Sequence, residues 1–334
     1  MSDYQHMLHR LQKKISLFKK QFLLLSTGKN TVFIFSLFFF SVIAFSILVL
    51  DQWIVEQTEK VTLQEIGFAV PTPAAYPLIG SVLGKQSRAE PPLSAHAAII
   101  MDNDSKVTLF SKNQDLRFSM ASTTKIMTAL VALEYFNLYD VLTMQEDSVE
   151  GAVVGFKKGE QVFFEDMLYA MLLPSGNDAA LAIAQNYQGG EKAFVEKMNQ
   201  KAESLHLLHT HYADSSGLND KGDYTTVVDL ARLAAVGLKD PVLSRIVGTK
   251  QKVIRTLQGN IYTLVNLNKL LGQDGVYGMK TGFTDEAGGV LVTLKKEGEK
   301  TFIVVVMKSV DRFADTEALL SLISGNAQFQ SMHQ

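Results

Sequence analysis

The sequence predicts a mixed α/β fold of the α+β type, in which an antiparallel sheet of about five strands is flanked by helices and carries a helical subdomain. The first observation behind this prediction is the order of the patterns: two strand-like segments, a long helical middle, three strand-like segments and a last helix. The second is a stretch of twenty uncharged residues near the start, which predicts one N-terminal transmembrane helix.

Composition excludes several classes of function. The 334 residues carry a formal net charge of −2 and no basic run beyond the N-terminal segment, so we expect no nucleic-acid partner. The chain has no cysteine, which rules out a disulfide, a cysteine nucleophile and a thiolate metal site. With 47% hydrophobic residues it can bury a substantial core. We expect no cofactor.

Residues 1–30 are predicted to form a basic amphipathic segment on the cytoplasmic face of a membrane. Apolar residues recur there at helical spacing between the lysines, namely Met7, Leu8, Leu11, Ile15, Phe18 and Phe22. A helix with this pattern lies on an anionic membrane surface, with its apolar side chains buried and its lysines near the headgroups.

The uncharged stretch is Thr31–Leu50, which as a helix spans roughly 30 Å, about the thickness of the hydrocarbon core. Lysines and Arg10 dominate the upstream flank, whereas Asp51, Glu56 and Glu59 follow it, so the N-terminus is expected in the cytoplasm and the rest of the chain outside. A cleaved signal peptide is the alternative. The stretch is longer than a usual signal-peptide core and no small-x-small cleavage site follows Leu50, so we favour an uncleaved, single-pass anchor in the cell membrane.

Residues 51–93 are predicted to be a stalk, because they show no sustained period and hold five of the seven prolines. The folded domain is expected over residues 94–325, and residues 326–334 form a tail. Its predicted strands are Ala95–Asp102, Lys106–Asn113, Val276–Phe283, Gly288–Lys296 and Lys300–Lys308. Its predicted helices are Phe118–Leu133, Phe164–Leu173, Asn177–Tyr187, Glu191–Leu207, Thr226–Leu238 and Asp311–Ile323.

Ser122 and Lys125 stand three residues apart at the start of the almost wholly apolar helix predicted over Phe118–Leu133. That spacing places both side chains on one face, so the serine could be a nucleophile with an amine beside it. The same residues also fit another interpretation, in which Ser122 is only the N-cap of a buried helix.

Two further motifs follow in order, Ser175-Gly176-Asn177 at a helix junction and Lys280-Thr281-Gly282 on a predicted strand. Similar patterns occur elsewhere, such as Ser16 to Lys19 and Ser111 to Asn113, but the first precedes the anchor and the second lies within a strand. Three motifs on separate elements of one extracytoplasmic domain can converge on one cleft.

In these motifs the domain resembles the low-molecular-weight penicillin-binding proteins, the serine-type D-alanyl-D-alanine carboxypeptidases of the DD-peptidase and β-lactamase superfamily. The resemblance covers Ser94 to Ile323 and not the anchor or the stalk. It extends to the blocks LLPSGNDAALAIA, DSSGL, YTTVVDLARLA, NLNKLL and GMKTGFTDEAGGVLV. It implies that the enzyme removes the terminal D-Ala from a peptidoglycan stem peptide ending in D-Ala-D-Ala, and that β-lactams acylate it.

The resemblance implies that Ser122 is the nucleophile and that Lys125 accepts its proton. A lysine has an ordinary pKa of about 10.4, and a second ammonium ~5 Å away, such as that of Lys280, would lower it by about two. We therefore expect that burial of Lys125 must add to the effect of Lys280 before the amine can act as a base near pH 7.

The resemblance also assigns the remaining site residues. Ser175 would relay a proton to the leaving D-Ala amine, and Asn177 would orient Lys125 and the substrate. Lys280 and Thr281 would hold the terminal carboxylate, while Gly282 would let the substrate backbone approach the strand. The backbone N–H groups of Ser122 and Phe283 would form the oxyanion hole. Leu267 departs from the family pattern, in which this position is often polar or basic, so carboxylate recognition is expected to rest more on Lys280 and Thr281.

Four alternatives remain. The first two, a DD-endopeptidase that cleaves cross-links and a catalytically inactive wall-binding module, would share the fold. The third, a β-lactamase, needs a carboxylate that activates the deacylating water, and the stretch HTHYADSSGLND, where class A enzymes carry it, has no glutamate. The fourth, a zinc site, is suggested by the cluster of His206, His209, His211 and Asp214, although no HExxH motif occurs. We expect a serine peptidase with no metal.

Overall fold

The computed structural model describes residues 91–146 and 149–324. The predicted cytoplasmic segment, the predicted anchor at 31–50, nearly all of the predicted stalk and the tail lie outside these residues. Within residues 91–146 and 149–324, no helix is long and apolar enough to cross a membrane.

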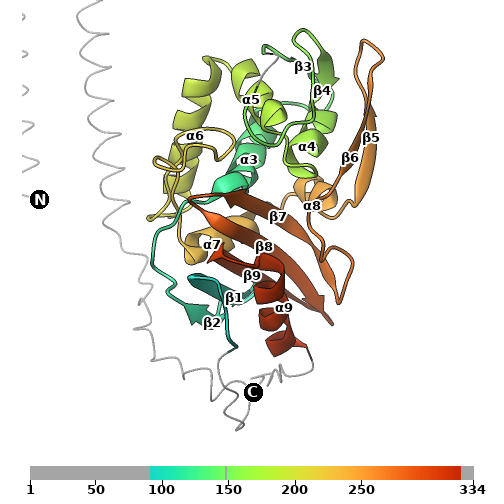
Figure 1. The fold of residues 1–334 in the computed structure, drawn as a ribbon. Coiled ribbons are helices and arrows are strands. Elements are labelled where there is room, and N and C mark those ends of the chain that lie inside the picture. The colour runs from blue at the N-terminus through green and yellow to red at the C-terminus, as the bar shows by residue number, and fades with distance from the viewer. Residues whose placement is uncertain (1–90, 147–148, 325–334) are drawn as a thin grey trace, which may run out of the picture. The chain divides into compact units, whose positions relative to one another are not determined.

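The centre of the molecule is a five-stranded antiparallel sheet with the order β2-β1-β9-β8-β7 (Figure 1). Its strands are β1 (Ala97–Asp102), β2 (Thr108–Lys112), β7 (Val276–Thr284), β8 (Gly288–Glu297) and β9 (Lys300–Ser309). The N-terminal hairpin joins the three later strands through β1 and β9, where Ile99 is paired with Val305. The predicted sheet of about five strands is therefore confirmed.

Both faces of this sheet are buried, because alternate residues of its central strands point to opposite sides. On β9, Ile303 and Val305 belong to the larger core on the side of the helical region, whereas Val304 and Val306 belong to a smaller core. The smaller core is closed by α9 (Arg312–Ile323), and α7 (Val227–Gly237) packs on the opposite face. Figure 1 shows α9 and α7 on either side of the sheet.

The helical subdomain lies at the β7 end of the sheet (Figure 1). Its helices are α3 (Lys125–Tyr135), α4 (Phe164–Leu172), α5 (Asn177–Asn186), α6 (Gly190–Ser204) and α8 (Pro241–Val247). Short hairpins accompany them, formed by β3 (Val141–Thr143) with β4 (Gln161–Phe163) and by β5 (Gln251–Arg255) with β6 (Ile261–Val265). The sequence analysis did not predict α8 or these hairpins, which are short and bury few side chains.

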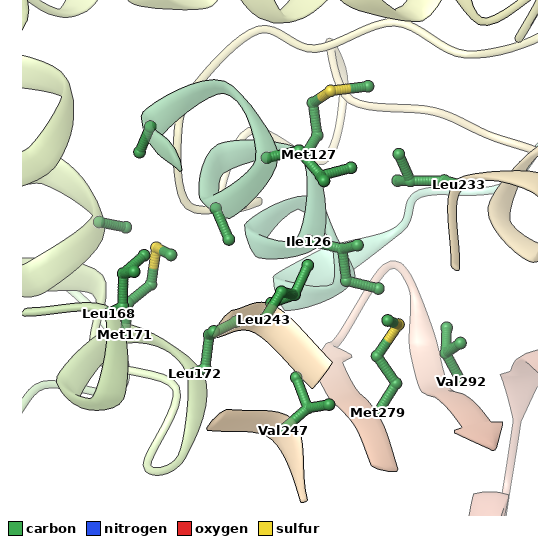
Figure 2. Close-up of a cluster of buried hydrophobic side chains, with 14 of the residues drawn as sticks. Ile126, Met127, Leu168, Met171, Leu172, Leu233, Leu243, Val247, Met279 and Val292 are labelled. Carbon is green, nitrogen blue, oxygen red and sulfur yellow. The ribbon is translucent and has the colours of Figure 1, made fainter. Parts of the chain in front are cut away.

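Apolar side chains of α3 join the subdomain to the sheet. Ile126 and Met127 are fully buried, and the same core contains Leu168 of α4, Leu243 of α8 and Met279 of β7. Figure 2 shows Ile126, Leu168, Leu243 and Met279 beneath α3, whereas Met127 points away from the opposite side of the helix. The first turn of α3 is therefore held between the subdomain and the sheet, which keeps the residues at its N-terminus in fixed positions.

Candidate active site

Ser122 lies in a 3₁₀ turn, η2 (Ala121–Thr124), and the α-helix begins only at Lys125. The predicted helix start at Phe118 was therefore wrong, and no side-chain capping bond is made at either helix start, so Ser122 is not an N-cap. Ala121 has a φ of 46°, a left-handed conformation that is unfavourable for alanine. Tertiary packing explains it: a side chain at Gly217 would sit 1.9 Å from the Ala121 carbonyl oxygen, so the loop presses directly on this turn.

Lys125 connects three parts of the site. Its Nζ lies 3.0 Å from Ser122 Oγ, 2.7 Å from Asn177 Oδ1 and 2.6 Å from the Ser216 carbonyl oxygen. The side chain is fully buried, and burial lowers its pKa to about 7, although the carboxylates of Asp214, Asp178 and Asp223 act in the opposite direction. A neutral amine with this pKa can accept a proton from Ser122 near neutral pH.

Burial is the largest cause of the low pKa of both lysines. Burial first, and then the charges of Lys125 and Arg312, lower the pKa of Lys280 well below its ordinary value. Because repulsion between two ammonium groups acts on both of them, the expectation that Lys280 adds to the effect of burial on Lys125 stays a prediction.

Ser175 and Lys280 form the second pair of the site. Lys280 Nζ donates to Ser175 Oγ at 2.9 Å and to the Thr281 carbonyl at 3.0 Å, and all three residues are buried. Ser175 has a φ of 66°, and the adjacent Gly176 has no room for a side chain, because a Cβ would lie 2.8 Å from the Ala170 carbonyl oxygen. A turn this tight aims the serine at Lys280 on the neighbouring sheet.

Asn177 begins α5 and bridges Lys125 to the surrounding loop. Its Oδ1 accepts from Lys125, and its Nδ2 donates to the Glu150 carbonyl at 2.7 Å. Because both ends of the amide are engaged, the orientation of the side chain is fixed with the oxygen toward the amine. The buried Asp178 beside it accepts from the N–H groups of Val154 and Gly155, which holds the facing loop.

Strand β7 runs past η2, the turn that contains Ser122, and carries Lys280, Thr281, Gly282 and Phe283. A Cβ on Gly282 would lie 3.1 Å from Ala121 Cβ and 3.2 Å from the Ser122 nitrogen, so glycine lets the strand approach Ser122 closely. The sequence analysis had attributed this glycine to room for substrate, and the structure adds a contact within the protein itself. Thr281 is buried, whereas Phe283 is 60% exposed.

The loop after Asp214 completes the site and was missed as a functional element. Ser216 supplies the carbonyl that holds Lys125, and the Asp214 carboxylate accepts from the N–H groups of Ser216, Gly217, Leu218 and Asn219. The signal was present in the sequence, because an aspartate followed by Ser-Ser-Gly is typical of a turn that caps its own backbone.

The histidines have other partners in the structure. His209 Nδ1 lies 3.0 Å from Arg117, and His211 Nδ1 lies 3.0 Å from the Gly222 carbonyl oxygen. In the part of the chain that the structure describes, no group of three or more His, Cys, Asp or Glu side chains is placed to hold a metal ion. Leu267 is 45% exposed.

Comparison with known proteins places this arrangement in a family. Residues 84–311 match the family model described as D-alanyl-D-alanine carboxypeptidase. A carboxypeptidase of that name from Streptomyces is 35% identical over 66% of this chain and 82% of its own length. The Bacillus subtilis carboxypeptidase DacF is 34% identical over 64% of this chain, which spans only 57% of that relative.

Solved structures of related proteins have the same fold as this chain. The crystal structure of a Streptomyces DD-transpeptidase matches 71% of this chain and 98% of its own with a TM-score of 0.67 and 33% identity. On a fold shared with these proteins, this chain carries two Ser-Lys pairs, Ser122 with Lys125 and Ser175 with Lys280, as expected of a serine peptidase with a lysine base. The chain therefore belongs to the D-alanyl-D-alanine carboxypeptidase family, serine hydrolases of the penicillin-binding protein class.

Proposed function

We propose that the protein is a membrane-anchored D-alanyl-D-alanine carboxypeptidase that removes the terminal D-Ala from peptidoglycan stem pentapeptides through an acyl-enzyme on Ser122. The observation that carries the proposal is the Lys125 amine, 3.0 Å from Ser122 Oγ and lowered by burial to a pKa of about 7. A serine hydroxyl needs such a base to attack an amide at neutral pH.

The proposed reaction proceeds in two steps. Ser122 Oγ attacks the carbonyl carbon of the penultimate D-Ala while neutral Lys125 takes the hydroxyl proton. As the peptide bond breaks, Ser175, which accepts a hydrogen bond from Lys280, passes its proton to the nitrogen of the leaving D-Ala, and the proton that Lys125 took from Ser122 replaces it. Water then attacks the ester, releases the shortened peptide and restores the Ser122 hydroxyl.

The substrate would be held by groups on β7 and η2. Lys280 and Thr281 would bind the terminal carboxylate, and the N–H groups of Ser122 and Phe283 would stabilise the oxyanion, a contribution of ~10²–10³ in rate per donor. A β-lactam would acylate Ser122 in the same way, but its leaving nitrogen stays attached through the opened ring. With no glutamate in place of the class A base, we propose that this adduct hydrolyses slowly.

The test is acylation of the full chain by a fluorescent penicillin, together with release of D-alanine from a pentapeptide. We expect covalent labelling that Ser122→Ala abolishes and that Ser111→Ala, a change of an exposed serine on β2, leaves intact. A Ser122→Ala protein that still forms the adduct would overturn the assignment, and rapid turnover of penicillin would identify a β-lactamase instead.

Endopeptidase activity is the second candidate, because relatives from Pseudomonas aeruginosa and Escherichia coli are named D-alanyl-D-alanine endopeptidases. They are 34% and 29% identical over 68% and 79% of this chain. Cross-linked muropeptide dimers separate the two candidates. A carboxypeptidase releases free D-alanine from pentapeptides and leaves dimers intact, whereas an endopeptidase converts dimers into monomers.

The proposed location is the cell membrane, with the N-terminus in the cytoplasm and the catalytic domain outside. It is supported by the uncharged residues 31–50 and by the basic residues that precede them. Protease added to intact spheroplasts should digest the catalytic domain and spare an epitope placed at the N-terminus. Digestion of neither, or recovery of the chain in the fraction free of membranes, would contradict the proposed topology.

A further inference from the structure

Two aspartates lie behind the carbonyl that holds Lys125, the half-buried Asp214 and the buried Asp223. Asp214 is the better satisfied of the two. Its carboxylate accepts hydrogen bonds from five donors, which are Ser216 N (2.6 Å), Ser216 Oγ (3.0 Å), Gly217 N (2.6 Å), Leu218 N (3.0 Å) and Asn219 N (2.6 Å). These five hydrogen bonds hold the backbone of loop 214–219 around the Asp214 carboxylate.

Asp223 has the opposite surroundings. It is 1% exposed, its Oδ1 accepts from Ala213 N at 2.7 Å, and its Oδ2 has no hydrogen-bond donor within residues 91–146 and 149–324. Its Oδ1 is held by the N–H of Ala213, the residue directly before Asp214, and the Asp214 carboxylate is the charge that acts on Asp223. Burial first and the Asp214 charge second raise the pKa of Asp223 to about 8. Protonation resolves the conflict, because a neutral carboxyl can donate to its neighbour.

The other ionisable groups around this pair come from three further elements. Lys125 faces the pair from α3, Glu191 of α6 accepts a hydrogen bond from Ser215, and Asp229 lies on α7. Tyr212, on the same loop as the pair, is buried, and its hydroxyl lacks a hydrogen-bond partner in the described structure. The charge of Asp229 acts on this hydroxyl. Lys125, Asp223 and Asp229 are buried, whereas Asp214 and Glu191 are half-buried. The protonation state of Asp223 therefore affects the residues nearest to the nucleophile.

We propose that Asp223 is a positioning residue for acylation: its neutral carboxyl donates a hydrogen bond to the Asp214 carboxylate, and this bond fixes the loop 214–219 whose Ser216 carbonyl holds the Lys125 amine beside Ser122. A shift of this loop would also displace the turn that carries Ser122, because Gly217 packs directly on the Ala121 backbone. Loss of the shared proton would place two carboxylate charges side by side and displace Ser216 from Lys125.

The inference predicts an alkaline loss of activity that the Ser122–Lys125 pair does not require. Lys125 becomes a better base as the pH rises through about 7, so its own titration increases acylation. Ionisation of Asp223 near pH 8 should then decrease the rate of acylation. Because the inference rests on the proposed acylation of Ser122, its test must also include a measurement that does not depend on activity.

The kinetic test measures the second-order rate constant for acylation of the full chain by a fluorescent penicillin from pH 5 to 10. For the unchanged chain we expect a rise near pH 7 and a fall above pH 8. Asp223→Asn, whose amide donates at every pH, should move the fall upward by at least one pH unit. Asp223→Ala, which cannot donate, should acylate at least tenfold more slowly than Asp223→Asn at pH 7. An unchanged falling limb in Asp223→Asn, or equal rates for the two variants, would overturn the proposal.

The second measurement is ¹³C NMR of the aspartate carboxyls in the unchanged chain. We expect one carboxyl to titrate near pH 8 and to disappear from the spectrum in Asp223→Asn. If every aspartate titrates below pH 6, the shared proton does not exist and the proposal fails. If the titration is present but penicillin never labels Ser122, the proton pair stands and the proposed function is what fails.

Discussion

Lys125 shows how a single buried residue makes the chemistry available. Its amine is removed from solvent and bonded to Ser122, Asn177 and Ser216, so the neutral form is present at a pH where an exposed lysine would be charged. The reactivity of Ser122 therefore depends on the packing of α3 rather than on the spacing of two residues in the sequence.

The cost of this arrangement predicts the outcome of Lys125→Met. Removal of the base should lower acylation by ~10²–10⁴. The pKa of Lys125 is about 7 in the folded chain and 10.5 in the unfolded chain, so between these pH values the unfolded chain binds more protons. Burial of Lys125 therefore lowers the free energy of unfolding, and this loss of stability is greatest below pH 7. Lys125→Met should therefore stabilise the fold more at pH 6 than at pH 10.

Urea unfolding of both proteins at pH 6 and pH 10 measures this difference. Lys192→Met, a change of an exposed lysine on α6, is the matched control and should alter neither acylation nor the pH dependence. A gain in stability that is equal at the two pH values would show that the buried amine is not titrating as the structure requires.

At the scale of elements, the site depends on how closely β7 approaches η2. Gly282→Ala would place a methyl group 3.1 Å from Ala121 Cβ and 3.2 Å from the Ser122 nitrogen, and the backbone of η2 must shift to accept it. We expect acylation to fall by about tenfold or more, since a displacement of ~1 Å can cost 10² in rate.

Gly237→Ala on α7 is the matched control for crowding. Its methyl group would lie 3.1 Å from Leu243 Cδ2 and from Met279 Cε, which are the ends of flexible side chains. It should keep the acylation rate, as measured with the same fluorescent penicillin. If Gly282→Ala acylates as fast as Gly237→Ala, close contact of β7 with η2 is not required.

Long periodic segments account for what could be predicted from the sequence. The three late strands and α9 were placed to within a residue or two. The signal is strongest in β8 and β9, which each bury a run of apolar residues. β5 and β6 were missed because only Ile254 and Leu264 are buried there, so the pattern of alternation carries little signal. The order of the motifs predicted which residues converge, but their roles remain predictions until tested.

The remaining differences arise from contacts distant in the sequence. No local pattern reveals that Gly217 packs against Ala121, where the helix predicted from Phe118 gives way to a 3₁₀ turn around Ser122. Nor does one reveal that Ser216 offers its carbonyl to Lys125, 91 residues away. Such contacts depend on the packed fold, so they could only be found in the structure.

At the scale of the whole molecule, Asp315 of α9 ties the beginning of the domain to its end. Its carboxylate accepts from Ser94 N at 2.8 Å, Ser94 Oγ at 2.7 Å, Ala95 N at 2.7 Å and Ser309 Oγ at 2.5 Å. Burial alone raises its pKa, but the bonds from Ser309, Ser94 and Ala95 outweigh burial and lower the pKa below its ordinary value. The ionised form is therefore the one that stabilises the fold.

Asp315→Ala should destabilise the domain by about 2–4 kcal/mol at pH 7, because four donors lose a charged partner. Since the folded pKa is lowered, this stabilisation is complete above the ordinary aspartate value of 3.8 and disappears as the pH falls through the lower folded value. Urea unfolding at pH 7 and pH 3 should show a difference between the two proteins that shrinks in acid. Glu317→Ala, an exposed change on the same helix, should have little effect at either pH.

The pairing of β1 with β9 has a consequence for the moment at which the enzyme becomes active. During translation, β1 is made early and has no neighbouring strand on one edge until β9 has been made. Ser94 likewise has no hydrogen bond to Asp315 until that residue, 221 positions later, has been added. Sheets that depend on such distant pairing form slowly and late. A nascent chain already carries Ser122, Lys125 and Ser175, yet it lacks β7 and the Lys280 that bonds to Ser175. We therefore expect the proposed acyl transfer to begin only after nearly the whole domain has been synthesised, and a chain that stops before β7 to lack it.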